Sequence, residues 1–519
     1  MDCIQLYNMP TTDNMVTTVN LISLNTDCSS TQKVQSYLPP IFNDSNRLTK
    51  LHTVFPEIDR MYKEYAEKNH FPGYAYGIMV DGQLAYSGTG GFIDLDKKTP
   101  VTIHSMFRIA SMTKSFTALA ILKLRDENKL KLDDPVYVYI PEAKDLKLTT
   151  DGPVITIRDL LMHSAGFPTD DPWADRKLDN TEKEFIELLK KGLFFSNVPG
   201  TTYEYSNLGY TMLGYIINKI TGASYTKFID EIIKLQGISW EFEKIPASQL
   251  AHGYRWINEN WKEEELLHDG IFGAMGGIFA SVESFSQYAA LHQLAWPPRN
   301  DSETGPVKRS SIREMHQPWR FKTLLVDKYL DGRERIIASG YGYGLNRLQD
   351  DQGRVFVGHS GGLPGFGSNW YILPEYGIGA ILFANVTYAP AAKINLDVLD
   401  KLVTAAELKP RHLPASNILN KRKNALVELL PKWENAVTSG IFADNFFLDY
   451  PISSLIKETN ELFAEAGIIV SVGDLIPENQ LRGYFTVKGE TMDLRISFAL
   501  APETPALIQQ FQIKSVTYT

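Results

Sequence analysis

Cysteine is scarce in this sequence of 519 residues, which contains two, Cys3 and Cys28. Both lie near the N-terminus, so they cannot cross-link the rest of the chain, and they form no metal-ligand cluster with nearby histidines. A single terminal disulfide and two free thiols are both compatible with this placement. A fold held together by disulfides is excluded.

Long apolar stretches and an excess of positive charge are also lacking. No run approaches the ~18 apolar residues of a membrane-spanning helix, so no integral membrane segment is expected. The 52 Lys and Arg face 61 Asp and Glu, for a formal net charge of −9. Nucleic-acid proteins rely on clustered cations, so we expect no nucleic-acid partner. The ordinary content of hydrophobic (44%) and charged (22%) residues indicates a soluble chain with about three folding units.

The N-terminus lacks the pattern of a secretory signal peptide. Asp2 stands where basic residues are expected, and the apolar stretch at 16–24 is interrupted by Thr17, Thr18 and Asn20. Secretion therefore has no support in the sequence. The expected location is periplasmic or extracellular if the true start is missing, and cytoplasmic otherwise.

Composition divides the chain into four parts. Residues 1–50 are rich in Thr, Asn and Ser without a sustained period, which predicts a flexible leader. A long body is predicted over residues 51–408. Two prolines in residues 409–414 indicate a linker, because neither fits inside a helix. A smaller C-terminal unit is predicted over residues 415–519.

The body has strand patterns at both of its ends and helical patterns between them. Asp81-Gly82 is a strong hairpin signal between two strand-like segments, and a broad apolar helix is predicted over 112–128. Residues 156–288 are predicted to be mostly helical. Strands are expected at 74–80, 83–87, 354–357, 369–373 and 378–385. This order predicts an α+β fold with one antiparallel sheet built from both ends of the body and a helical insertion.

The C-terminal unit is predicted to be a second, small α+β fold. Helices are expected at 418–438 and 452–466, and strands at 468–472, 480–488, 492–500 and 509–518. Apolar and polar residues alternate in the strands, so one face of the sheet should pack on the helices. The order of elements is similar to cystatin-like or NTF2-like folds. An accessory role in gating, in binding a ligand or in forming a homo-oligomer stays open.

The sharpest local motif is Ser111-Met112-Thr113-Lys114, directly before the apolar helix. Positions i and i+3 share a helix face, so the Lys114 amine can lie beside the Ser111 hydroxyl. A desolvated lysine has a lowered pKa and can activate a serine as nucleophile. The helix N-terminus favours the negative charge that then develops. The alternative is an N-capping serine followed by a surface lysine.

Tyr205-Ser206-Asn207 stands between a Pro-Gly turn and an apolar helix. A tyrosine at such a helix entry can shuttle a proton, and Asn207 can hold a substrate amide or orient Lys114. The alternative is an aromatic loop with a helix cap.

His359-Ser360-Gly361-Gly362 follows a predicted strand. Successive glycines allow a ligand to approach the backbone, and the N–H of Gly362 can pair with that of Ser111 as an oxyanion hole. The alternative is a glycine-rich turn after the strand.

No metal or cofactor is expected. The ten histidines include no His-Glu-x-x-His or His-x-His pair. The glycine-rich stretch at 88–91 lacks the following Lys-Ser or Lys-Thr of a phosphate-binding loop.

Together and in this order, S-x-x-K, Y-x-N and H-x-G resemble the motifs of the serine β-lactamase and penicillin-binding-protein superfamily. The histidine in the third motif is similar to that of D-aminopeptidases, some D-Ala-D-Ala carboxypeptidases and related esterases, and Y-x-N is similar to class C β-lactamases. The resemblance covers about residues 50–405, with softer agreement at 132–136, 157–166, 276–278 and 341–344. It implies a β-lactamase-like fold, in which an antiparallel sheet is flanked by helices and joined to a helical subdomain.

The resemblance also implies residue roles. Ser111 would be the acylated nucleophile, Lys114 and Tyr205 would share general acid–base duty, and Asn207 would position the substrate. The segment His359, Ser360, Gly361 and Gly362 would line the substrate site. The chain lacks the deacylating glutamate of class A β-lactamases, so Tyr205 with Lys114 would have to activate the water.

We therefore expect a serine hydrolase that acts through an acyl-enzyme on a small-molecule or peptide substrate: a D-amino-acid peptide, a β-lactam or an ester. The alternative is a catalytically idle sensor that binds a ligand or penicillin in the same pocket. His359 stands where lysine-bearing relatives hold a substrate carboxylate. Imidazole is mostly neutral at pH 7, so we expect a weak clamp that strengthens as the pH falls through the histidine pKa.

Overall fold

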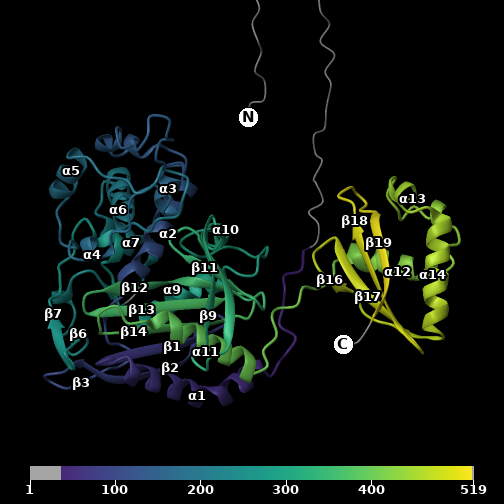
Figure 1. Cartoon of the computed structure of the whole chain (residues 1–519), viewed down its shortest axis with the longest axis horizontal. Helices are drawn as coiled ribbons and strands as arrows, with labels where there is room; N and C mark the ends of the chain where they lie inside the picture. Colours follow the sequence, from purple (N-terminus) through teal and green to yellow (C-terminus); the bar gives the residue numbers. More distant parts are fainter. Residues whose placement is uncertain (1–36, 236, 517–519) are drawn as a thin grey trace, which may run out of the picture. The chain divides into compact units, whose positions relative to one another are not determined.

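The computed structural model describes residues 37–235 and 237–516 (Figure 1). Cys3, Cys28 and most of the predicted leader lie outside these ranges. Helix α1 (Arg47–Lys68) already begins within the last residues of that leader. None of the helices in the described ranges combines the length and hydrophobicity that a membrane crossing requires.

The body is built around a nine-stranded sheet with the strand order β3-β2-β1-β14-β13-β12-β11-β10-β9. Neighbouring strands are antiparallel, and β1 (Gly73–Val80), from the start of the body, pairs with β14 (Ile378–Ala384), from its end. The predicted antiparallel sheet from both ends of the body is thus confirmed. The remaining strands are β2 (Gln83–Asp94), β3 (Thr99–Pro100), β9 (Arg320–Lys328), β10 (Glu334–Tyr341), β11 (Asn346–Asp350), β12 (Val355–Leu363) and β13 (Phe366–Leu373).

Helices cover both faces of this sheet, and β1 shows how its side chains divide between them. Tyr74, Tyr76 and Ile78 pack with α1 and α11 (Ala391–Ala405) in one hydrophobic cluster. Ala75 and Met79 point to the other face, into a cluster that includes α2 (Thr113–Asp126) and α9 (Val282–Leu294). Because alternate residues of a strand face opposite sides, a strand buried on both faces loses the polar–apolar alternation of an ordinary antiparallel strand.

Helices are the main regular structure between the two halves of the sheet, although they include fewer than half of residues 156–288 and short strands also occur there. These helices are α3 (Ile157–Leu161), α4 (Asp171–Ala174), α5 (Glu182–Lys190), α6 (Asn207–Thr221), α7 (Tyr225–Ile233) and α8 (Gly273–Gly276), before α9. Residues 253–264 instead form the hairpin β6 (Gly253–Ile257) and β7 (Asn260–Glu264). Asn258 and Glu259 join its strands with positive φ angles of 49° and 61°, the backbone of a tight hairpin turn.

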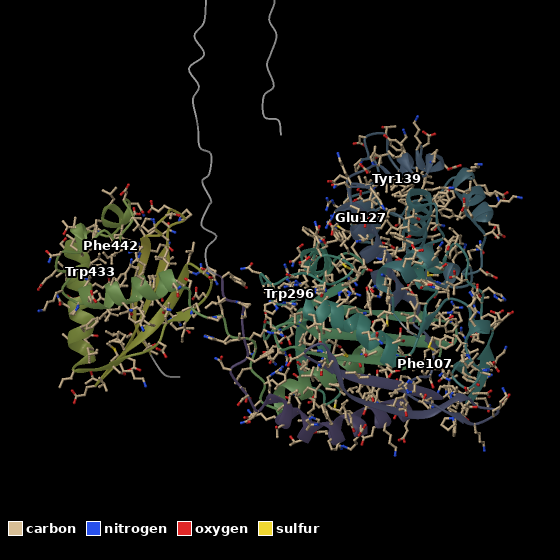
Figure 2. The ribbon with its side chains drawn as sticks, turned by 180° about the vertical axis from the view of Figure 1, so that it is seen from behind. Phe107, Glu127, Tyr139, Trp296, Trp433 and Phe442 are labelled. Carbon is tan, nitrogen blue, oxygen red and sulfur yellow. The ribbon has the colours of Figure 1, made fainter. Side chains whose placement is uncertain are left out.

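The C-terminal residues have a hydrophobic cluster of their own, in which Trp433 and Phe442 pack with ring centroids 5.8 Å apart (Figure 2). The helices are α12 (Asn417–Leu429), α13 (Phe446–Asp449) and α14 (Ile452–Ala466). The sheet has the order β15 (Ile469–Val472), β17 (Arg482–Gly489), β18 (Asp493–Leu500) and β19 (Ile508–Val516), and β16 (Ile476–Pro477) also pairs with β17. The predicted helix over 418–438 is shorter, because α12 ends before Pro431.

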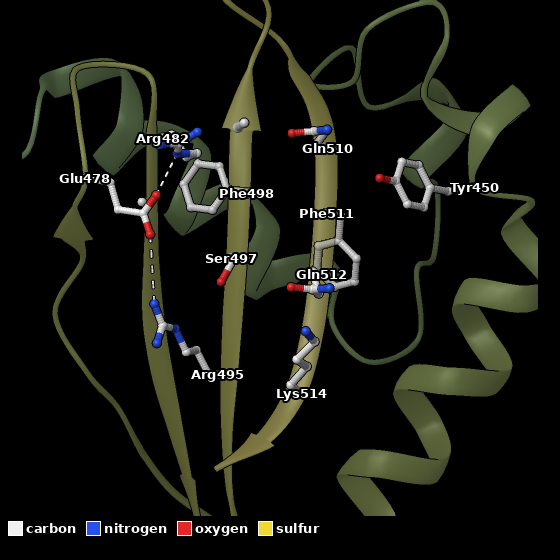
Figure 3. Close-up of a pocket in the computed structure, with 12 residues that line it drawn as sticks. Tyr450, Glu478, Arg482, Arg495, Ser497, Phe498, Gln510, Phe511, Gln512 and Lys514 are labelled. Carbon is white, nitrogen blue, oxygen red and sulfur yellow. Dashed lines mark hydrogen bonds and ion pairs between the residues drawn. The ribbon is translucent and has the colours of Figure 1, made fainter. Parts of the chain in front are cut away.

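The polar face of this small sheet is hollowed into a pocket of about 490 Å³ (Figure 3). Glu478 lies beside two cations there, 2.6 Å from Arg482 and 3.9 Å from Arg495. Gln512 and Lys514 of β19 line the same hollow. An exposed polar face is ordinary for an antiparallel sheet that packs on helices on its other side.

Candidate active site

Ser111 lies at the point where the chain enters α2. A 3₁₀ turn over Ala110–Met112 carries it, and α2 begins at Thr113. Ala110 has a positive φ of 51°, which is uncommon for a residue with a Cβ and marks local backbone strain. The side chain of Ser111 lines a cavity of about 630 Å³ together with Tyr205, His359 and Gly362.

Lys114 is fully buried one helical turn beyond Ser111. Its Nζ lies 3.0 Å from the Ser111 Oγ, 2.6 Å from the Asn207 Oδ1 and 2.8 Å from the carbonyl oxygen of Met275. The N-cap position of α2 is occupied by Met112 and not by Ser111. The alternative of a capping serine with a surface lysine is therefore excluded.

The surroundings of Lys114 make its amine easier to deprotonate than that of an exposed lysine. Burial lowers the pKa of its amine to about 8, against the opposing effect of Asp171 and other nearby carboxylates. A neutral amine has two hydrogens and one lone pair. The two carbonyl oxygens can accept the two hydrogens, which leaves the lone pair for the hydroxyl hydrogen of Ser111. This geometry suits a general base.

Tyr205 lies on the other side of Lys114, with its ring centroid 4.9 Å from the Nζ. Burial raises the pKa of its phenol well above the ordinary value and the charge of Asp171 adds to this, while a hydrogen bond to Ser111 acts in the opposite direction. The phenol therefore stays protonated at neutral pH. The acid–base duty expected to be shared by Lys114 and Tyr205 stays a prediction. A lysine with a lowered pKa suits the part of base, and a protonated phenol suits the part of proton donor.

Asn207 is bonded to Lys114 at one end of its side-chain amide and to Asp171 at the other. Its side chain is fully buried, its Oδ1 accepts from Lys114, and its Nδ2 donates to the Asp171 Oδ1 at 2.7 Å. The backbone N–H of Asn207 donates to the Asp170 Oδ1 at 2.6 Å. The expectation that Asn207 positions the substrate stays a prediction: Oδ1 and Nδ2 each have one partner within the protein, and the second N–H of Nδ2 is the group left to donate to a substrate.

His359 is buried and neutral. The hydroxyl of Tyr341 lies 2.9 Å from its Nε2, and its Nδ1 lies 2.5 Å from the carbonyl oxygen of Ser360. Burial lowers its pKa to about 3, and the charge on Lys114 adds to this. This lowered pKa argues against the expected carboxylate clamp, because a clamp of that kind needs an imidazole that becomes charged near its ordinary pKa.

The motif of His359 to Gly362 lies within strand β12 and not in a turn after it, which excludes the alternative of a glycine-rich turn. Ser360 lines the cavity and accepts a hydrogen bond from Asn369 at 3.0 Å. A Cβ on Gly361 would lie 2.1 Å from the carbonyl oxygen of Ile109. The glycine is thus required by the close approach of β12 to the turn that carries Ser111. Pairing of the Gly362 and Ser111 amides as an oxyanion hole stays a prediction.

We expect Gly361→Ala to lower the free energy of unfolding by about 3 kcal/mol and to slow labelling of Ser111 by a serine-directed probe. The added methyl group cannot fit unless β12 moves away from the turn. Gly305→Ala is the matched control, because a Cβ there would meet its nearest atom at 3.5 Å. Chemical denaturation and labelling rates measure both effects, and equal stability of the two variants would contradict the packing argument.

Several cavity residues carried no recognisable motif. They are Asp171, Tyr203, Lys322, Asn346 and Tyr388. The run Asp170-Asp171-Pro172 has the composition of a helix start, so the sequence could have predicted α4. It could not have predicted that Asp171 accepts a hydrogen bond from Asn207. Lys322 stands in an ordinary strand pattern, so only the tertiary structure brings it to the cavity.

One group in the described ranges has metal-ligand chemistry, formed by Glu241, Glu243 and His268. Two of its members are exposed, and none lines the cavity that contains Ser111. This group is therefore separate from the site built around Ser111 and Lys114.

A model of the family described as Beta-lactamase matches residues 58–404. The protein named Protein flp, from Staphylococcus aureus, is 25% identical over 383 residues, which are 73% of this chain and 69% of that protein. Beta-lactamase-like protein 2 from Dictyostelium discoideum is 28% identical over 281 residues, 52% of this chain and 51% of that protein.

Two solved structures share the fold. The octameric penicillin-binding protein homologue from Pyrococcus abyssi aligns with a TM-score of 0.58 and 22% identity, over 88% of this chain and 99% of that one. The penicillin binding protein from Bacillus halodurans aligns with a TM-score of 0.52 and 21% identity, over 66% of this chain and 98% of that one.

Proposed function

Because the chain belongs to the Beta-lactamase family, we propose that it is a serine hydrolase that forms an acyl-enzyme at Ser111. The superfamily consists generally of hydrolytic serine enzymes. The observation that carries the proposal is the buried Lys114 amine, 3.0 Å from the Ser111 Oγ and held by two carbonyl oxygens.

In the first half-reaction, the Ser111 Oγ attacks the carbonyl carbon of an ester or amide while Lys114 takes the hydroxyl proton. The carbonyl oxygen gains negative charge, and the N–H groups of Ser111 and Gly362 receive it. The bond to the leaving group then breaks. The leaving group takes a proton from Tyr205, which regains one from Lys114, so the acyl-enzyme forms with Lys114 neutral again.

In the second half-reaction, water replaces the leaving group. Lys114 accepts a proton from the water as its oxygen attacks the acyl carbon, and the bond between that carbon and the Ser111 Oγ breaks. Proton return through Tyr205 restores the serine hydroxyl. No further carboxylate is needed for this step, because one base works in both directions.

The substrate class we propose is a small amide or ester: a D-amino-acid peptide, a β-lactam or a simple ester. A cavity of about 630 Å³ is the size of a site for a small molecule. The same cavity would serve a sensor that becomes acylated and never turns over, so the test must separate labelling from turnover.

The test treats the full chain with a fluorophosphonate and, separately, with a fluorescent penicillin. We expect one probe per chain by intact-mass spectrometry, located on Ser111 by peptide mapping. Turnover of nitrocefin, p-nitrophenyl esters and D-aminoacyl anilides then identifies the reaction. Labelling at another residue, or no labelling, would overturn the proposal. A stable adduct without turnover of any substrate would favour the sensor.

A further inference from the structure

Edge strand β9 contains a bulge at Lys322. Thr323 pairs with Ser339 of β10, and Phe321 pairs with Gly340, so Lys322 has no partner in the ladder. A bulge changes the direction of the side chain it carries and is frequent beside active sites. Here it places Lys322 in the lining of the cavity that also contains Ser111.

The Lys322 amine meets neutral groups in the cavity. Its Nζ donates to the Asn346 Oδ1 at 2.7 Å and lies 4.8 Å from the ring centroid of Tyr203. No carboxylate of the described residues lies within ion-pair distance of it. Lys328, at the exposed end of the same strand, instead pairs with Glu334 at 3.5 Å. Lys322 is thus a cation without a counter-ion in the described chain.

Burial lowers the pKa of Lys322 to about 8, and no nearby negative charge opposes this effect. The amine is still mostly protonated at pH 7. A partly desolvated cation in this state gains more from an incoming anion than an exposed lysine would.

The other charged groups of the cavity cannot serve an anionic ligand. Lys114 is buried with three hydrogen-bond partners, and His359 is neutral. Among the described residues that line the cavity, the charged ones are Lys322 and Asp171. Asp171 is an anion, and its Oδ1 accepts a hydrogen bond from Asn207. Lys322 is therefore the cation that a ligand in this cavity can reach.

Asn346 supplies a second donor beside this cation. Its backbone is held between Tyr341 of β10 and Gly358 of β12, so its position is fixed by two neighbouring strands. Its Oδ1 is bonded to Lys322, and its side chain lines the cavity, so the Nδ2 is the donor that Asn346 can offer to a ligand there. A planar carboxylate has two oxygens and can accept from both groups.

We propose that Lys322 and Asn346 form an anion subsite of the cavity, which binds a carboxylate group of the substrate. That the bound carboxylate belongs to a substrate rests on the hydrolase function proposed above, whereas the anion subsite itself does not. The enzyme is then selective for acyl compounds that carry a free carboxylate at a distance from the reacting carbonyl.

The kinetic test uses p-nitrophenyl hydrogen adipate and its neutral methyl ester, and compares their kcat/KM values as a ratio. We expect the wild-type ratio to favour the carboxylate. Lys322→Met should lower the ratio about tenfold, whereas Lys322→Arg should retain most of it. Lys328→Met is the matched control and should leave kcat/KM unchanged for both substrates.

A second variant guards against a folding defect in Lys322→Met. Asn346→Asp keeps the shape of the side chain and places a carboxylate against the Lys322 amine, so it should lower the ratio as well. Thermal melting shows whether each variant folds. An unchanged ratio in folded Lys322→Met or Asn346→Asp would overturn the subsite.

A binding test separates this subsite from the hydrolase function. Adipate and the neutral adipamide are titrated into the full-length wild type and Lys322→Met, and binding is followed by ligand-observed NMR. Adipate binding that depends on Lys322 in a chain without esterase activity would support the subsite and reject the hydrolase. Acylation of Ser111 without preference for adipate would support the hydrolase and reject the subsite. Equal competition by inorganic phosphate would show a general anion site and overturn selectivity for carboxylates.

Discussion

Ser111→Ala is expected to abolish covalent labelling and to lower turnover about a millionfold, the loss typical of removing a serine nucleophile. The fold should remain intact. Lys114 keeps Asn207 and Met275 as partners after the hydroxyl is removed, so the free energy of unfolding should change by no more than about 1 kcal/mol.

Intact-mass spectrometry after fluorophosphonate treatment checks this expectation, and urea denaturation checks the fold. Ser115→Ala is the matched control, because Ser115 lies on the same helix with its Oγ bonded to the carbonyl oxygen of Met112 at 2.8 Å. An adduct on Ser111→Ala would reject Ser111 as nucleophile. Loss of labelling in Ser115→Ala as well would show that packing of α2 limits the reaction.

Lys114→Met should slow acylation by about a thousandfold or more, because it removes the base while keeping a side chain of similar length. The pH dependence gives a second signature. Burial favours the neutral amine and lowers its pKa from 10.5 to about 8, so the active form is the deprotonated one. The wild-type rate should therefore fall about tenfold for each pH unit below 8 and level off above it.

The measurement is the acylation rate between pH 6 and 9.5 with a neutral ester, so that the charge on Lys322 does not affect substrate binding. Lys123→Met is the control on the same helix, where Lys123 pairs with Glu127 at 3.1 Å. We expect the control to retain the rise toward pH 8 and Lys114→Met to lose it. The same rise in both variants would assign the titration to another group.

Local sequence patterns were sufficient for the parts of the fold and site that depend on neighbouring residues. Asp81-Gly82 joins β1 and β2, as its turn chemistry predicted. Ser111 and Lys114 are three residues apart at a helix start, so their proximity follows from helix geometry alone. The sheet built from both ends of the body could be expected because strand patterns occur at both ends and helical patterns lie between them.

Features that depend on distant contacts could not be read in this way. Gly361 looked like a residue that admits a ligand, but the carbonyl oxygen of Ile109 occupies that space. The side chain of Asn207 is fixed by two distant contacts, because its Oδ1 accepts from Lys114 and its Nδ2 donates to Asp171. His359 was expected to titrate like a free imidazole, and only the tertiary structure shows how deeply it is buried. Lys322 lines the cavity because of a bulge in β9, and the local sequence pattern does not predict that bulge.

The pairing of β1 with β14 also has a consequence for synthesis on the ribosome. Gly77 is made early, whereas its sheet partner Ile381 emerges only near the end of the body. Until then one edge of β1 has no strand beside it, and unpaired strand edges favour aggregation. The segment around Ser111 leaves the ribosome long before Gly361, which closes the turn from the other side. A nascent chain therefore contains Ser111 before the surroundings of the proposed nucleophile are complete, and we expect any activity to arise late in translation.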